Sequence, residues 1–116
     1  MKNLPESDRA IVDIGKLRDY CLNPNHPEGR HKARVFLSAL GVAAADSEWL
    51  AEAILAALPD AEAEAQSETD WGTLYRVDIE IARGRRCAKV RTGWICTAKE
   101  TKFVTCFVIG ECDETA

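Results

Sequence analysis

The chain has 116 residues, of which 47% are hydrophobic, and its formal net charge is -4. This length fits one domain, residues 1–116, with a single modest core, and is too short for two domains. The negative charge makes the chain a poor general binder of polyanions, and there is no run of about 18 apolar residues that would predict a membrane-spanning helix.

The N-terminal sequence MKNLPESDRA is polar where a signal peptide would be apolar, so we expect a soluble, cytoplasmic protein that does not bind a membrane. The cysteines are Cys21, Cys87, Cys96, Cys106 and Cys112. Their number is odd and none forms a C-x-x-C pair, so we expect reduced thiols, no zinc site and no other cofactor.

Three helices are predicted in the first half of the chain, over residues 13–22, 29–40 and 47–58. In each segment apolar side chains recur at helical spacing after a residue that favours a helix start. The first helix ends at NPNHPEG, whose two prolines hold His26 in a rigid loop. The second begins near Gly29 and ends at Gly41, and its N-terminus favours anions.

The second half of the chain is predicted to form a sheet. Residues 59–72, rich in Asp and Glu, are expected to be an acidic connector. After Gly72 the apolar period becomes two, which predicts three to four antiparallel strands over residues 73–110, with turns at ARGRR and TAKET. Helices followed by an antiparallel meander give an α+β fold.

Basic residues gather in this second half, and their function has two interpretations. The set is Arg76, Arg83, Arg85, Arg86, Lys89, Arg91, Lys99 and Lys102. A local basic field can hold a phosphate backbone because screening limits the reach of distant acids. Alternatively, the charges only solvate the outer face of the sheet.

The segment LNPNHPEGRHKARVF contains both histidines, His26 and His31, beside Arg30, Lys32 and Arg34. Histidine moves protons near neutral pH, and a lysine or arginine stabilises negative charge that develops on a phosphoryl oxygen. The plainer interpretation is that His26 is a loop residue and His31 an exposed residue of the first helical turn. Two histidines without an acidic or thiol partner at ligand spacing leave a zinc site short of ligands.

A second candidate patch lies in the strand segment RTGWI. Thr92 and Trp94 share one face, which offers a hydroxyl beside an aromatic surface, and Thr105 of the next strand is expected to join them. The alternative is that Trp94 is a core residue and both threonines are strand formers. If the helix over 29–40 docks with its N-terminus across these strands, the two patches form one cleft; otherwise they are separate.

The segments LRDYCLNPNHPEGRHKARVFLSALGV, VRTGWI and FVTCFVI resemble a bacterial family of unknown function. Its members occur as small stand-alone proteins and as C-terminal modules of polymorphic toxins, of the contact-dependent inhibition and filamentous-haemagglutinin type. The resemblance covers residues 4–109, and Phe107 stands where the family more often has tyrosine. The matching polar residues are His26, Gly29, His31, Lys32, Trp94 and Thr105. Toxin modules of this kind resemble, at the level of fold, barnase, colicin and EndoU-like nucleases.

The resemblance implies a metal-independent endoribonuclease, in which the 2′-hydroxyl of RNA attacks its own phosphodiester to leave a cyclic phosphate. The expected catalytic residues are His26, His31, Lys32 and Thr105. The expected RNA- and phosphate-binding residues are Arg30, Arg34, Lys89, Arg91, Thr92 and Trp94, with Trp94 stacking on a base. The alternative is a non-catalytic interaction module or inactive toxin relative, whose basic sheet face binds an acidic partner such as a cognate antitoxin or immunity protein.

Overall fold

The computed structural model describes residues 4–5 and 9–112 of the chain, and it is an α+β structure. The helical part comprises α1 (Ile14–Lys16), the π-helical turn η2 (Leu17–Cys21), α2 (Arg30–Leu40), η3 (Ala44–Asp46), α3 (Ser47–Ala57) and η4 (Leu58–Asp60). The strands are β1 (Ala63–Thr69), β2 (Gly72–Arg83), β3 (Arg86–Cys96) and β4 (Thr101–Glu111). The predicted class, helices followed by an antiparallel sheet, is therefore confirmed.

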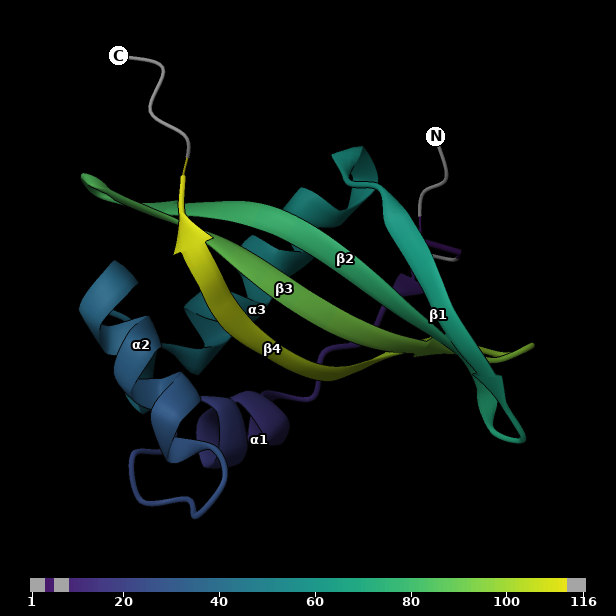
Figure 1. Cartoon of the computed structure of the whole chain (residues 1–116), viewed down its shortest axis with the longest axis horizontal. Coiled ribbons are helices and arrows are strands. Elements are labelled where there is room, and N and C mark those ends of the chain that lie inside the picture. Colours follow the sequence, from purple (N-terminus) through teal and green to yellow (C-terminus); the bar gives the residue numbers. More distant parts are fainter. Residues whose placement is uncertain (1–3, 6–8, 113–116) are drawn as a thin grey trace.

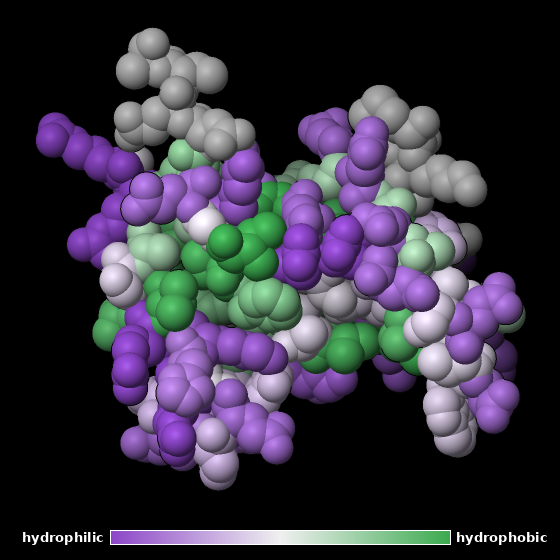
Figure 2. Space-filling model, in the orientation of Figure 1, coloured by the Kyte–Doolittle hydropathy of each residue, from purple (hydrophilic) through white to green (hydrophobic). Residues whose placement is uncertain are grey.

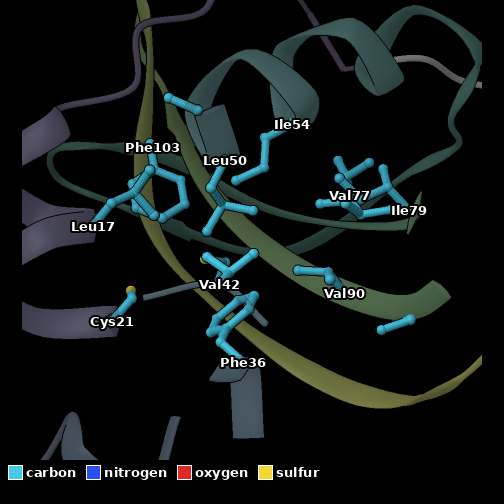
Figure 3. Packing of buried hydrophobic residues seen from close by; sticks show 14 of the residues in the cluster. Leu17, Cys21, Phe36, Val42, Leu50, Ile54, Val77, Ile79, Val90 and Phe103 are labelled. Carbon is cyan, nitrogen blue, oxygen red and sulfur yellow. The ribbon is translucent and has the colours of Figure 1, made fainter. Parts of the chain in front are cut away.

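The strands form one antiparallel sheet in the order β1-β2-β3-β4, and the helices cover one of its faces (Figure 1). Helix α3 packs on β2, and α2 lies along β3 and β4. The hydrophobic core fills the space between the two layers and includes Leu17, Phe36, Leu50, Ile54, Val77, Val90 and Phe103 (Figure 3). Strand β2 contributes one apolar face to this core because its residues alternate. Val77, Ile79 and Ile81 are buried, and the charged residues between them are exposed.

The first correction to the sequence prediction concerns the acidic segment 59–72. Residues 63–69 of that segment form β1, an edge strand paired antiparallel with β2. All its residues after Ala63 are exposed, so the segment lacks the apolar alternation by which a half-buried strand is recognised. Residues 63–69 thus form a strand because they pair with β2, although Ala and Glu have a low propensity for strands.

The second correction concerns the cysteines. Cys87 and Cys112 form a disulfide, and their Cα atoms are 5.6 Å apart. Next to them Ala88 pairs with Glu111, so the register of β3 and β4 brings the two cysteines opposite each other. Counting and spacing along the chain could not show this pairing. The three free cysteines among the described residues are Cys21, Cys96 and Cys106.

A register shift in β4 positions one candidate residue. Trp94 pairs with Phe103 but Gly93 pairs with Thr105, so Val104 is the extra residue of a β-bulge. Phe103 points into the core, whereas Thr105 is only half-buried, although an unbroken strand would place both on one face. The bulge therefore turns the side chain of Thr105 away from the core.

Candidate functional site

The start of α2 is fastened to the turn before it. Gly29 precedes the helix and lies so close to the carbonyl oxygen of Tyr20 that a Cβ atom would overlap it. The ring Nδ1 of His26 accepts hydrogen bonds from the backbone N–H groups of Glu28 and Gly29, both at 3.0 Å. Both N–H groups belong to the turn that precedes α2, so His26 fixes the conformation of this turn and not the first turn of the helix itself. The contact of Gly29 with Tyr20 holds the start of α2 against η2.

This docking places the ammonium group of Lys32 between two hydroxyl groups. Lys32 Nζ donates to Tyr20 Oη at 2.7 Å and to Thr105 Oγ1 at 3.1 Å. It also lies 4.4 Å from the centroid of the Tyr20 ring and 5.6 Å from that of Phe107. Lysine, tyrosine and threonine are all half-buried, so the charge is shielded from bulk water without being sealed off.

Two buried thiols lie behind the lysine. Cys21 Sγ is 3.9 Å from Thr105 Oγ1, and both Cys21 and Cys106 are fully buried. The pKa of Cys21 is lowered to about 6, chiefly by a hydrogen bond from the Cys106 side chain, with smaller help from Thr105 and the Lys32 charge. Burial and the neighbouring Cys21 raise the pKa of Cys106. The contact between the two thiols thus favours the thiolate form of Cys21 and the protonated form of Cys106.

Two cavities open at this site, and Phe107 lines both of them. One, of about 270 Å³, is lined by His31, Lys32, Val35, Phe107 and Val108. The other, of about 240 Å³, has Thr105, Phe107 and Gly93 in its lining. Figure 2 shows hydrophobic surface over β4 between the hydrophilic surface of α2 and the charged strands. Val104 and Ile109 of β4 are exposed apolar residues. Lys32 and Thr105 can therefore be approached from outside.

The structure joins some of the predicted site residues and separates others. Lys32 and Thr105 are in contact, and His31 lines the same cavity as Lys32. The His26 ring lies edge-on to Tyr20 with centroids 4.8 Å apart, but its Nδ1 is occupied by the backbone. Arg30 and Arg34 lie on the other flank of α2, where they line a cavity of about 400 Å³ with Leu22 and Val42.

Two predicted binding residues are not on the surface. Thr92 and Trp94 are fully buried on the core side of the sheet. Trp94 Nε1 donates to Thr92 Oγ1 at 2.8 Å, and Thr92 Oγ1 donates to the carbonyl of Val77 at 2.7 Å. A ring enclosed in this way has no free face, so the predicted stacking of a base on Trp94 is wrong. The alternative interpretation, that Trp94 belongs to the core, is the correct one.

The charges on the outer face of the sheet compensate one another. Arg91 donates to both carboxylate oxygens of Asp78, at 2.9 and 3.1 Å, and Arg76 pairs with Glu64 of β1. Lys89 lies half-buried on the same strand as Arg91. The outer face is thus a mixture of paired charges, not the free basic field that the sequence alone suggested.

Tyr20 and Cys21 belong to the site but were not among the residues predicted from the sequence. Cys21 fits the apolar stripe of the first helix, and Tyr20 is adjacent to it. No spacing rule connects them with Lys32 or with Thr105, which is 84 residues from Cys21. Only the docking of η2 and α2 at the β4 edge brings these four residues together.

A family model described as "Domain of unknown function (DUF6883)" matches residues 3–110. The chain belongs to the DUF6883 family. The match includes every residue of the Lys32 site, from Tyr20 to Phe107, whereas Cys112 of the disulfide lies beyond it. No curated protein and no solved structure matches the chain.

Two further findings concern the described part of this DUF6883 chain. Within residues 4–5 and 9–112, no helix is long and apolar enough to cross a membrane. In the same part of the chain, no three His, Cys, Asp or Glu side chains group together as ligands for a metal ion. The polar groups at the site are the Lys32 ammonium, two hydroxyls, the thiol pair and two nearby histidines.

Proposed function

We propose that this DUF6883 domain is a metal-independent endoribonuclease. The observation that carries the proposal is the half-buried Lys32 ammonium held between the hydroxyls of Tyr20 and Thr105. Lys32 lines one open cavity and Thr105 lines the other. Both hydroxyl oxygens accept from Lys32, which leaves the Tyr20 hydrogen free to donate. The Thr105 hydroxyl also lies 3.9 Å from Cys21 Sγ, and its hydrogen turns from that sulfur to a phosphate group when one is bound. Together with the third N–H of Lys32 they present donors suited to one phosphate group.

Such a site stabilises the charge that develops when RNA is cut through its own 2′-hydroxyl. The 2′-oxygen forms a bond to phosphorus, the bond from phosphorus to the 5′-oxygen breaks, and a 2′,3′-cyclic phosphate remains. Lys32, Tyr20 and Thr105 donate to the phosphoryl oxygens of the pentavalent intermediate. Preorganised donors in a partly dehydrated site are worth about 10² to 10³ in rate for each donor removed.

The proton transfers are assigned to histidine. His31 is exposed on the first turn of α2 and lines the Lys32 cavity, so it takes the proton from the 2′-hydroxyl. His26 has only Nε2 available, since Nδ1 accepts from the backbone. We therefore assign to His26 chiefly the role of holding the loop. The 5′-oxygen is protonated either by His31, which returns the proton it took, or by water. Arg30 and Arg34 make no side-chain hydrogen bond or ion pair with the described residues and remain available to flanking phosphates.

The fold is compatible with this proposal by analogy only. Helices followed by an antiparallel sheet resemble the barnase, colicin and EndoU-like ribonucleases, several of which serve as toxin modules. We propose a toxin-like role, with RNA in the cytoplasm as the target and a cognate immunity protein as the inhibitor. The Cys87–Cys112 disulfide fits a chain that passes through an oxidising environment before it meets RNA.

The competing proposal, a basic sheet face that binds an acidic partner, has less support. It requires free positive charge on the outer face, but Arg91 and Arg76 are already paired with Asp78 and Glu64. Exposed pairs of this kind contribute little to stability, yet they reduce the field that a distant acidic partner would encounter.

The test is RNA cleavage in EDTA by the wild type and by the variants Lys32→Met and Thr105→Val, with analysis of the product ends. The matched control is Lys102→Met, which removes the same charge from an exposed lysine paired with Glu100. We expect cyclic-phosphate ends from the wild type and the control, and a loss of about 10² or more in rate in the two site variants. Absence of cleavage by folded wild-type protein, or equal activity in all four proteins, would refute the proposal.

A further inference from the structure

The hairpin that joins β1 to β2 presents the most exposed large hydrophobic side chain of the described residues. Trp71, at its tip, is 81% exposed. The turn around it is fixed: Thr69 Oγ1 donates to the carbonyl of Gly72 at 2.9 Å and accepts from the N–H of Trp71 at 3.1 Å. Gly72 has φ +144° and passes so close to the carbonyl of Cys96 that a side chain would collide with it. The indole is therefore displayed by a rigid support.

Next to this tip runs an open sheet edge. Strand β1 pairs with β2 on one side only and is the outermost strand of the sheet (Figure 1). Strand β1 has seven residues, which span about 23 Å. Among the described residues, the only hydrogen bond to its backbone outside the β1–β2 ladder and the turn is from Gln66 Nε2 to the carbonyl of Glu64. An edge of this length with unpaired N–H and C=O groups can accept another strand.

The charge along this edge selects the class of strand that can bind. Glu62, Glu64, Glu68 and Asp70 lie on β1 or beside it, and Glu64 alone of them forms an ion pair with a described residue. A second copy of the chain would place like charges opposite one another, which destabilises a strand pair. RNA is repelled for the same reason. An extended segment with alternating lysine or arginine side chains complements the edge.

We propose that the outer edge of β1, together with Trp71, binds an extended basic segment of another protein as an additional strand of the sheet. Backbone hydrogen bonds supply affinity, the acids select the charge of the segment, and Trp71 packs on the uncharged side chains that alternate with the basic ones. The edge lies across the sheet from β4, so the complex leaves the Lys32 site open. This inference does not depend on the ribonuclease proposal.

The test uses three synthetic probes with the full chain: a peptide of alternating threonine and lysine, the same peptide with glutamate in place of lysine, and the lysine peptide with alternate backbone N-methylation. Binding is followed by hydrogen exchange of the amides in residues 63–69 and by tryptophan fluorescence. We expect the lysine peptide to slow exchange at least about tenfold at saturation and to shift the emission of Trp71 to shorter wavelength. The other two peptides should do neither.

Two variants complete the experiment. Trp71→Ala should weaken binding of the lysine peptide about tenfold, whereas the control Leu37→Ala, which removes another exposed apolar side chain, should leave it unchanged. Failure of the lysine peptide to protect residues 63–69 would overturn the proposal. Equal binding by the N-methylated peptide would overturn it too, since simple charge attraction would then suffice. A response of Trp71 to single-stranded RNA and not to the peptide would assign the surface to nucleic acid instead.

Discussion

The ammonium of Lys32 and the hydroxyl of Thr105 are 3.1 Å apart although the two residues are separated by 73 positions in the chain. The helix start that carries Lys32 is held by His26 and Gly29, and the bulge at Val104 turns Thr105 toward it. Two independent local features therefore converge on one contact. Disturbing either of them should disturb the site without touching its reactive groups.

The first prediction concerns the helix support. Gly29→Ala introduces a Cβ atom that overlaps the carbonyl of Tyr20, so η2 and α2 must move apart. Overpacking of this kind costs about 1 to 3 kcal/mol of unfolding free energy, measurable by urea denaturation. The variant should also lose RNA cleavage, because Lys32 moves with the helix. Gly110→Ala is the control, since no atom lies within 4 Å of a Cβ at Gly110; equal stability of the two variants would contradict the prediction.

The sequence predicted more of the fold than of the site. Alternation along RTGWI correctly placed Thr92 and Trp94 on one face, but a period of two does not tell which face the helices cover. Both residues lie in the core, and the opposite face, with Arg91, is the half-buried outer side of the sheet. The exposed strand β1 has no apolar period at all, and was missed for that reason.

The site itself depends on contacts that are distant in sequence. Lys32 and Thr105 were predicted from their residue types and from the family resemblance, yet their contact requires α2 to dock at the β4 edge. Tyr20 reaches Lys32 because the backbone of Gly29 packs directly against the carbonyl group of Tyr20. In the sequence that approach is visible only as a glycine before a helix, and glycine also occurs at such positions for its backbone freedom alone.

A second prediction follows from the buried thiol pair. The pKa of Cys21 is lowered from its ordinary value of 9.0 to about 6, chiefly by the hydrogen bond from Cys106. Between pH 6 and 9 the unfolded chain therefore binds a proton that the folded chain has lost, and stability should rise with pH in this window. This contribution is lost as the pH falls through about 6. The raised pKa of Cys106 acts oppositely, at pH values above its ordinary 9.0.

Urea denaturation at a series of pH values tests this second prediction. Thiolate absorbance in the ultraviolet gives the titration of Cys21 directly, and Cys21→Ala should remove both the titration and the rise of stability. The free Cys96, whose pKa is raised by burial, provides the control in Cys96→Ala. A rise of stability that persists in Cys21→Ala would show that other groups cause it.

A third prediction concerns the disulfide between Cys87 and Cys112. It closes a loop with a sequence separation of 25 residues, for which the loss of unfolded-state entropy stabilises the fold by about 3 kcal/mol. Adding a phosphine reductant should lower the urea midpoint of the wild type accordingly. The double variant Cys87→Ser/Cys112→Ser should have the lower midpoint from the start and should not respond to the reductant. An unchanged wild-type midpoint on confirmed reduction would refute the prediction.

The last prediction separates two roles for His26. If the ring chiefly fixes the turn before α2 through Nδ1, His26→Ala should destabilise the fold by about 1 kcal/mol. His26→Asn should then retain stability, because its side-chain oxygen can accept the same N–H groups. RNA cleavage should then fall only in the destabilised His26→Ala variant, and His26→Asn should stay active. If His26 instead transfers a proton, both variants should lose about 10² to 10⁴ in rate while the asparagine variant remains folded. His31→Asn provides the comparison, because His31 is exposed and should lose rate without losing stability. The pair of variants thus assigns proton transfer to one histidine and support of Lys32 to the other.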